Sequence, residues 1–161
     1  MTGGQHSTDE GDLIQVAFPL EQDEDGYPPV NEERLPVRKL TDTVGQIVRA
    51  PFFITGVSNG DMIAFSDPSE GVARFGELLS VRGHSTLRVI FFDESQERRL
   101  VDELQQLGCI VETGGIPDLI AVDVPPAVDY RRVRAVLSAG ESAELWEYEE
   151  GCLSAEHRAQ S

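Results

Sequence analysis

A histidine stands beside two hydroxyl residues in Gly83-His84-Ser85-Thr86, a combination that could carry nucleophilic catalysis. In that chemistry an imidazole removes the proton from a serine hydroxyl. An apolar run beginning at Thr86 predicts a strand, however, and adjacent residues of a strand point to opposite faces. His84 and Ser85 would meet only at a sharp turn, and the chain has no G-x-S-x-G elbow. They are therefore candidate catalytic residues, with hydrogen bonding to backbone amides as the alternative role.

Carboxylates alternate ahead of a glycine in the segment that follows the first predicted strand, a spacing used by calcium-binding loops. The candidate metal ligands are Glu21, Asp23, Asp25 and Glu32. Alternating carboxylates and a terminal Glu can wrap a hard cation. The pattern departs from that motif because the first ligand is Glu, two prolines follow the glycine, and the flanks predict strands. We therefore expect an acidic turn without a metal.

A third group of chemically active residues mixes acids with aromatic rings near the C-terminus. It consists of Trp146, Glu147, Tyr148, Glu149 and Glu150. Paired carboxylates can perform acid–base chemistry, but no neighbour in the sequence would raise the pKa of one of them. A solvated strand edge that deters aggregation is one interpretation. The other is a protein-binding surface, because Trp and Tyr are favoured interface anchors and carboxylates steer basic partners.

The charge of the chain points to the same kind of partner. The 161 residues carry a formal net charge of −16. Fourteen acidic and six basic residues up to Arg82 give −8, and fifteen acidic and seven basic residues after it give another −8. Such a field repels nucleic acid and anionic membranes and attracts basic proteins. We therefore expect a basic protein partner, no nucleic acid and no membrane.

Composition indicates a folded protein of the cytoplasm. Hydrophobic residues make up 40% of the chain and charged residues 26%, which is too apolar for a disordered chain. No apolar stretch approaches the roughly 18–20 residues of a membrane span, and residues 1–12 lack a signal pattern. Cys109 and Cys152 do not have the spacing of a disulfide framework or a metal site. Both are expected to be reduced thiols, with Cys109 inert in an apolar core.

The elements that must position these residues divide at about residue 82. Residues 1–12 are polar and are expected to form a disordered tail. Residues 13–82 contain short β-prone runs with no helix among them, which predicts a small antiparallel β-sheet or barrel. The expected strands are Leu13–Leu20, Arg34–Leu40, Thr43–Arg49, Phe52–Thr55, Met62–Phe65 and Val72–Val81.

Residues 83–153 have a different pattern, in which strands alternate with helices. Four strands are expected at Thr86–Phe92, Cys109–Thr113, Leu119–Val124 and Glu144–Glu149. Two apolar stripes at helical spacing lie between them, so the order is β-α-β-β-α-β. That order predicts a ferredoxin-like α+β subdomain with both helices on one face of an antiparallel sheet. Residues 154–161 lack apolar periodicity and are expected to form a second disordered tail.

Capping residues mark the ends of both helices. Asp93 and Gln96 have the spacing of a capping box, and Gly108 is a left-handed terminator for the first helix. Asp129 is expected to cap the second helix, and Gly140 to end it.

Eight local motifs form a recognisable set: Glu21–Pro29, Pro51–Phe53, Gly56–Asp61, Gly83–Thr86, Arg88-Val89, Leu107–Cys109, Ala121–Pro126 and Trp146–Glu150. With these motifs the chain resembles a bacterial family known as domain of unknown function 4265. The resemblance covers roughly Val16 to Leu153 and implies one evolutionary unit, without an activity that could be assigned to single residues.

The leading functional hypothesis is a non-enzymatic module that binds a basic protein partner, with an immunity or antitoxin-like neutraliser as its sharpest form. A small-molecule sensor or accessory regulatory protein that uses the ferredoxin-like half is the alternative, on fold analogy alone. An enzyme that uses His84 with nearby carboxylates is a further alternative. No cofactor is expected under the leading hypothesis, and the oligomeric state is left open.

Overall fold

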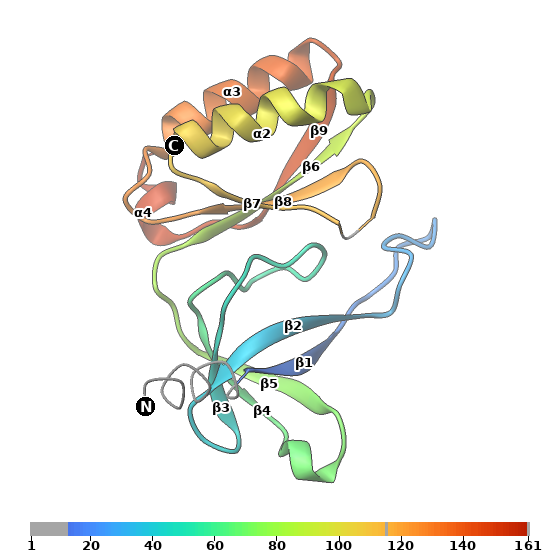
Figure 1. Cartoon of the computed structure of the whole chain (residues 1–161), viewed down its shortest axis with the longest axis vertical. Helices are drawn as coiled ribbons and strands as arrows, with labels where there is room; N and C mark the ends of the chain where they lie inside the picture. Colours follow the sequence, from blue (N-terminus) through green and yellow to red (C-terminus); the bar gives the residue numbers. More distant parts are fainter. Residues whose placement is uncertain (1–12, 115, 161) are drawn as a thin grey trace, which may run out of the picture.

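The computed structural model describes residues 13–114 and 116–160 of the chain. Figure 1 shows two β-structures stacked along the long axis, with helices covering one end. Most strands pair antiparallel, and three short α-helices lie within the described residues. Residues 1–12, expected to be a disordered tail, lie outside the described ranges.

The elements follow one another in two groups. The first group consists of β1 (Leu13–Pro19), β2 (Glu32–Lys39), β3 (Val44–Ile47), β4 (Met62–Phe65), the 3₁₀ turn η1 (Pro68–Glu70) and β5 (Ala73–Ser80). The second group consists of β6 (Ser85–Phe91), the 3₁₀ turn η2 (Glu94–Gln96), α2 (Glu97–Gln106), β7 (Ile110–Glu112), β8 (Leu119–Val124), α3 (Tyr130–Ser142), β9 (Trp146–Cys152) and α4 (Ala155–Arg158).

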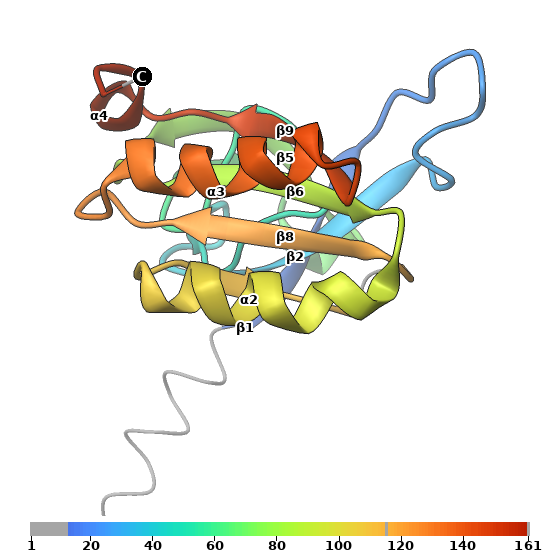
Figure 2. The same cartoon turned by 90° about the horizontal axis from the view of Figure 1, so that it is seen from above.

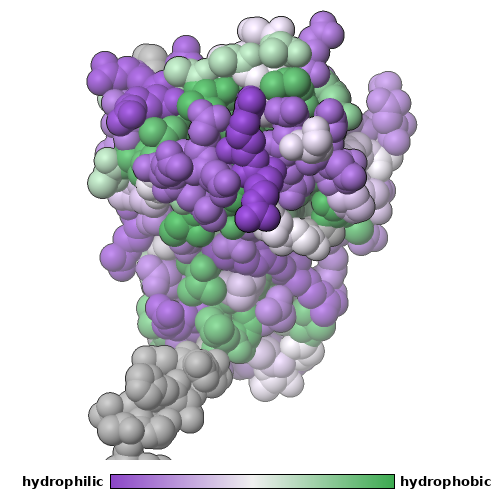
Figure 3. All heavy atoms as spheres, turned by 45° about the horizontal axis from the view of Figure 1, so that its top comes forward, coloured by the Kyte–Doolittle hydropathy of each residue, from purple (hydrophilic) through white to green (hydrophobic). Residues whose placement is uncertain are grey.

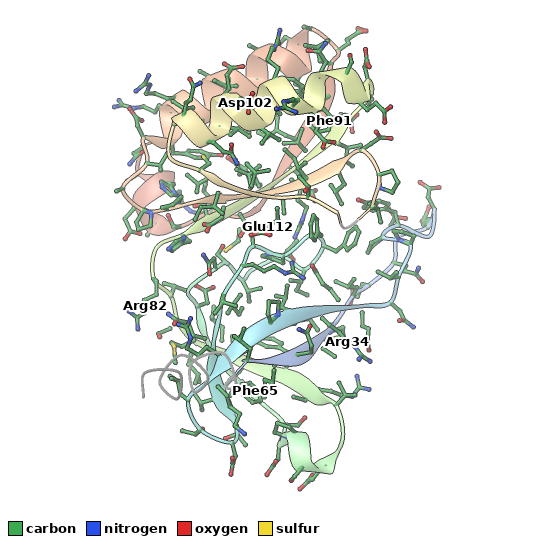
Figure 4. All side chains as sticks on the ribbon, in the orientation of Figure 1. Arg34, Phe65, Arg82, Phe91, Asp102 and Glu112 are labelled. Carbon is green, nitrogen blue, oxygen red and sulfur yellow. The ribbon has the colours of Figure 1, made fainter. Side chains whose placement is uncertain are left out.

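The first five strands close into a barrel around an apolar core. Consecutive strands pair antiparallel, whereas β1 and β5 pair in parallel through Val16–Ala73 and Ala17–Arg74. The parallel pair joins the first strand to the last, and it departs from the wholly antiparallel arrangement that the sequence predicts. Figure 4 shows Phe65 within this barrel. The main buried residues are Val16, Phe18, Leu35, Val37, Ile47, Ile63 and Phe65.

The prediction of a strand at Phe52–Thr55 is wrong, because this segment belongs to an irregular connection between β3 and β4. Its backbone amides bond to a side chain in place of a neighbouring strand. The buried Glu33 carboxylate accepts hydrogen bonds from the amides of Phe52 at 2.6 Å, Phe53 at 2.9 Å and Ile54 at 2.9 Å. These charge-assisted bonds satisfy three donors without a strand ladder.

The second sheet has the strand order β7-β8-β6-β9, with every neighbouring pair antiparallel. Its elements follow as β-α-β-β-α-β from β6 to β9. Helices α2 and α3 lie side by side on one face of the sheet, and the barrel lies beyond the other face (Figures 1 and 2). The core between helices and sheet includes Leu87, Val89, Phe91, Leu100, Leu104, Ile120, Val122, Val133, Leu137 and Trp146.

The helix ends agree with the sequence in part. Asp129 caps α3 by accepting from the Arg131 amide at 3.1 Å, as predicted. Asp93 accepts from the Ser95 amide at 3.0 Å, but this cap opens the 3₁₀ turn η2 ahead of α2. Gly108 has φ of 104°, the left-handed conformation expected of a terminator. Gly140 does not end α3, which continues to Ser142.

Helix α4 forms at Ala155–Arg158, within residues 154–161, where the sequence predicts a disordered tail. Ser154 caps α4 by accepting from the His157 amide, and His157 has no exposed surface. The Ser85 hydroxyl lies 2.6 Å from His157 Nδ1, and Nε2 lies 3.0 Å from the Pro125 carbonyl. The carbonyl can only accept, so Nε2 donates to it, and Nδ1 is the ring nitrogen that contacts the Ser85 hydroxyl.

The barrel and the sheet meet through the connection between β3 and β4. Ala50 and Phe52 of this connection pack against Leu119 and Ala121 of β8 in a small apolar cluster. The Gly56 amide donates to a carbonyl at the end of β9 at 3.1 Å. The connection thus lies against the face of the sheet that the helices leave uncovered.

No helix in the described part of the chain is long and apolar enough to cross a membrane.

Candidate functional site

Trp146 is a core residue, which corrects its predicted role as an interface anchor. Its exposed fraction is 1%, and its indole N–H donates to the Leu137 carbonyl at 2.9 Å. The ring meets Phe91 edge to face, with ring centroids 5.9 Å apart. Because residues of a strand alternate between faces, the strand that holds Trp146 inward turns Glu147 outward. The aromatic–acidic segment is therefore divided between core and surface.

The carboxylates of β9 differ in their surroundings. Glu147 is exposed. Glu149 is also exposed, but its Oε1 accepts from Arg88 Nη1 at 3.1 Å. Glu150 accepts from the hydroxyl of the buried Tyr130, and burial is the largest cause that raises the pKa of Tyr130. Of these three β9 carboxylates, Glu147 therefore contributes least to holding the fold together.

Tyr148 is the aromatic residue of β9 that reaches the surface. It is half-buried, and its hydroxyl lies 3.0 Å from the Ser138 hydroxyl of α3. Tyr27, from the loop between β1 and β2, lines the same pocket. This pocket holds about 100 Å³ and is lined by Tyr27, Arg88, Ile90, Glu147, Tyr148 and Glu149. We call it the Tyr27 pocket.

The β1–β2 loop that carries Tyr27 also carries four exposed carboxylates. In Figure 1 the loop projects from the barrel on the right of the view. Burial raises the pKa of Tyr27, and the Glu149 and Asp23 charges raise it further. The acidic surface, as we call it, consists of the exposed carboxylates of the loop and of the pocket-facing side of β9: Glu21, Asp23, Glu24, Asp25, Glu147 and Glu149.

The structure gives Asp23 and Glu32, two of the candidate metal ligands, other roles in the fold. Asp23 Oδ1 accepts from the amides of Asp25 and Tyr27, each at 2.9 Å, which shapes the turn. Glu32 lies in β2 and forms ion pairs with Arg34 at 2.8 Å and Arg74 at 3.5 Å. Residues 13–114 and 116–160 contain no group of three His, Cys, Asp or Glu residues placed to hold a metal.

Arg88 forms part of the wall of the Tyr27 pocket and was not singled out as a site residue by sequence reasoning. Its side chain is 4% exposed, and its Nη2 donates to the Ile54 carbonyl. A Cβ atom at Gly151 would lie 2.8 Å from Nη1, so glycine leaves room for the guanidinium. Arg88 Nε is buried without a partner among the described residues. An arginine within the apolar run of β6 was the available signal.

His84 and Ser85 point to different partners, as expected for neighbours at a strand. His84 Nδ1 lies 2.7 Å from Asp123 Oδ1, and Asn59 donates to Asp123 Oδ2 at 2.8 Å. Ser85 bonds to His157 instead. A carboxylate so placed orients an imidazole, but the hydroxyl needed for a nucleophile–base pair is turned away. His84 does not line the Tyr27 pocket.

A second buried carboxylate lies near this histidine. Asp61 is 1% exposed, and its Oδ2 accepts from the Ser58 amide at 2.9 Å while Oδ1 has no partner among the described residues. Burial raises the pKa of Asp61 to about 6, partly offset by the backbone amides of Ser58 and Arg82 and by the His84 charge. The sequence indicated only a turn here, since nothing local revealed that the fold would cover the carboxylate.

Cys109 is buried, in keeping with the expected inert thiol. Burial raises the pKa of its thiol to about 12, with a smaller contribution from the charge of Asp123. A thiol with such a pKa carries almost no thiolate near neutral pH.

Most of the chain matches a known protein family. The model of the family described as "Domain of unknown function (DUF4265)" matches residues 33–148. The chain belongs to the DUF4265 family. This confirms the resemblance found in the sequence. The residues matched to DUF4265 include Arg88, Asp123 and Glu147, whereas Tyr27 precedes them.

A solved structure has the same fold as this DUF4265 protein. It is a hypothetical protein from Neisseria gonorrhoeae, known from a crystal structure, with a TM-score of 0.72 and 19% sequence identity. The alignment covers 88% of this chain and 96% of that chain. At this identity the likeness shows the fold alone. A comparison with curated proteins finds no match.

Proposed function

We propose that this protein is a non-enzymatic interaction module whose acidic surface binds a basic protein partner. One observation carries the proposal: Tyr27 shares a pocket with Glu147, Tyr148 and Glu149. Tyr27 of the β1–β2 loop and the β9 carboxylates Glu147 and Glu149, far apart in the sequence, therefore meet at one pocket. The field of these carboxylates and of those in the loop favours a cationic partner, and the Tyr27 ring offers apolar contact area.

The other large face gives less support for docking. In Figure 3 the helix-bearing end comes forward, with hydrophilic residues over much of the face and apolar residues in separate smaller groups. Arginines also lie on α3, including Arg131 and Arg134, so that face is less uniformly acidic. A basic partner is thus drawn toward the acidic surface rather than the helices.

In its sharpest form the proposal makes the protein a neutraliser, as an immunity protein or antitoxin is. Such a protein blocks its partner by covering a cationic surface that the partner needs for its own activity. A net charge of −16 supports that role because it speeds the encounter between the two proteins.

We also propose a finer description of the architecture: a barrel unit over residues 13–82 and a ferredoxin-like unit over residues 83–153. The strand order β9-β6-β8-β7 and the two helices on one face support the second unit. The binding surface then combines the last strand of one unit with a loop of the other.

The proposal is tested by Glu147→Lys, with Asp102→Lys as a control of equal charge change. Both residues are exposed, and Figure 4 shows Asp102 on the helix layer. Tagged wild-type protein and both variants are used to capture proteins from an extract of the source cell at about 0.1 M and 0.5 M salt, where the Debye length falls from roughly 10 to 4 Å. Retained proteins are identified by mass spectrometry and purified for binding measurements.

The proposal is supported by a basic protein that binds directly, whose binding weakens as salt rises and is abolished by Glu147→Lys but not by Asp102→Lys. A direct partner that is acidic, or that binds wild type and both variants equally, overturns it. Glu149 is left unchanged because replacing it would strand the buried Arg88 guanidinium without its carboxylate.

A further inference from the structure

Among the strands that the structure describes, none pairs with the outer edge of β9. In the order β7-β8-β6-β9, this strand is last, and no described strand follows it. An edge strand presents backbone N–H and C=O groups that can pair with an added strand. The edge of β9 is therefore a second feature of the region that carries the acidic surface.

The register with β6 identifies the backbone groups that face outward. The Phe91 amide donates to the Asp118 carbonyl on the β8 side, so the backbone groups of Ile90 face β9. Ile90 pairs with Glu147, which places the backbone groups of Glu147 toward β6 and those of Tyr148 toward the free edge. The Tyr148 amide confirms this direction by donating to the Glu141 carboxylate at 3.4 Å.

The outward-facing backbone groups of β9 make few hydrogen bonds within the described residues. The bond from the Tyr148 amide is long, and its acceptor is the carboxylate of an exposed residue. Farther along, the Gly151 carbonyl accepts from Gly56, which closes that end of the strand. The stretch from Trp146 to Glu150 is thus the part of the edge open to pairing.

The side chains select which strand can pair there. Glu147 and Glu149 stand on the face that carries the Tyr27 pocket, two residues apart. Like charges opposite each other destabilise a strand pair, whereas opposite charges stabilise it. A second copy of this acidic chain is repelled, and a segment with basic residues at alternate positions is favoured.

We propose that the basic partner adds an extended segment to the free edge of β9, with Lys or Arg at alternate positions facing Glu147, Glu149 and the Tyr27 pocket. The inference rests on the proposed function and specifies how the partner is held. Backbone bonds to Tyr148 supply affinity, and side-chain pairs on one face supply selectivity. Tyr148 keeps its ring toward α3 in this arrangement.

The test uses the wild-type full chain and blocked peptides of about nine residues, a length that spans an ordinary strand. The first peptide alternates lysine with valine. The second has the same composition with the lysines grouped together. The third is the alternating peptide with N-methyl groups on the amides of one edge, which keeps its charge and removes those hydrogen-bond donors. Binding is followed by amide chemical shifts and hydrogen exchange.

We expect the alternating peptide to shift the amides from Trp146 to Glu150 and to slow exchange at Tyr148. The grouped and N-methylated peptides should bind about ten-fold more weakly, which corresponds to one or two lost hydrogen bonds. Equal affinity of the alternating and N-methylated peptides would overturn strand addition. Shifts confined to the helices would overturn it as well.

The two proposals fail in distinguishable ways. If the alternating and N-methylated peptides bind equally well, and Glu147→Lys weakens both, the acidic surface stands and strand addition is rejected. If no cationic peptide binds and no basic protein is captured, both proposals are rejected.

Discussion

Gly140 lies directly against the indole ring of Trp146. A Cβ atom at position 140 would stand 1.8 Å from Trp146 Cζ2 and 2.1 Å from Cε2. Real Cβ atoms do not approach other atoms so closely, so only glycine lets α3 lie this near to β9. The glycine therefore allows α3 to pack against β9. The Trp146 ring that it contacts is buried and cannot reach a binding partner.

Gly140→Ala should destabilise the protein although alanine is the better helix former. In an exposed helix the change would stabilise by about 1 kcal/mol. Here the added methyl group overlaps the buried indole ring, and we expect a net loss of about 2–4 kcal/mol. Chemical denaturation followed by tryptophan fluorescence measures the free energy of unfolding.

The neighbouring position supplies the control for this substitution. Ala139 is exposed on α3, so Ala139→Gly should cost only about 1 kcal/mol. A Gly140→Ala variant that is as stable as wild type, or more stable, would show that α3 and β9 can move apart without cost.

Glu33→Gln should weaken the fold more than Glu32→Gln at the half-buried neighbouring position. The Glu33 carboxylate accepts from three amides, whereas an amide side chain offers one acceptor oxygen and turns an NH₂ group toward donors. We expect a loss of about 2–4 kcal/mol, because hydrogen bonds to a buried charged group are the strong ones. Glu32 makes ion pairs at the surface, so its replacement should have the smaller effect.

Unfolding free energies of both glutamine variants decide between these roles. Equal losses would contradict the idea that the Glu33 carboxylate holds the connection between β3 and β4. Loss of protection in the amides of Phe52, Phe53 and Ile54 under hydrogen exchange would locate the effect of Glu33→Gln.

Strands with a clear apolar pattern could be predicted from sequence, because burial follows that pattern directly. Met62–Phe65 and Leu119–Val124 have the predicted bounds. Caps with local partners, such as Asp129, were also predictable. Phe52–Thr55 was not, since its apolar residues suit a strand equally well and only the distant Glu33 removes the need for ladder partners. A local apolar pattern thus predicts strands and helices. It does not reveal a distant side chain, such as Glu33, that supplies hydrogen bonds in place of a strand ladder.

The candidate site shows the same limit. Glu147 and Glu149 were predicted to be surface carboxylates, and they are exposed. The role of Trp146 was wrong because an alternating strand can place either set of residues inward. Tyr27 and Arg88 reach the pocket only through long-range packing, and no local spacing could join residue 27 to residue 147. The contribution of the β1–β2 loop therefore required the structure.

Asp61→Asn should change how stability depends on pH. Burial raises the pKa of Asp61 to about 6 in the folded state, against an ordinary value of 3.8. A raised pKa means that the folded state favours the protonated form. Its stabilising contribution is complete below pH 3.8 and is lost as the pH rises through about 6. Two pKa units correspond to roughly 3 kcal/mol.

The neutral asparagine removes this dependence, and its side-chain oxygen can keep the hydrogen bond from the Ser58 amide. Relative to wild type, the variant should therefore gain up to about 3 kcal/mol between pH 4 and pH 8. Unfolding free energies measured for both proteins across that range test the sign. A difference that stays constant with pH, or that falls as pH rises, would show that Asp61 does not titrate as described.

Tyr27→Ala and Glu147→Lys should affect different steps of binding to the alternating lysine–valine peptide. Charges steer the encounter, so Glu147→Lys should slow association at low salt and lose most of this effect at about 0.5 M. The Tyr27 ring lines the pocket and acts after the encounter, so Tyr27→Ala should raise the dissociation rate by about ten-fold. Stopped-flow fluorescence of a labelled peptide measures both rates.

Tyr27→Phe is the matched control, because it keeps the ring and removes only the hydroxyl. It should retain the wild-type dissociation rate if apolar contact with the ring holds the peptide. Since Tyr27 is 38% exposed and lies in a loop, both variants should keep the fold, which circular dichroism can verify. A Tyr27→Ala variant with unchanged dissociation would remove the β1–β2 loop from the binding surface. The β9 edge and Glu147 would then have to account for the peptide's affinity alone.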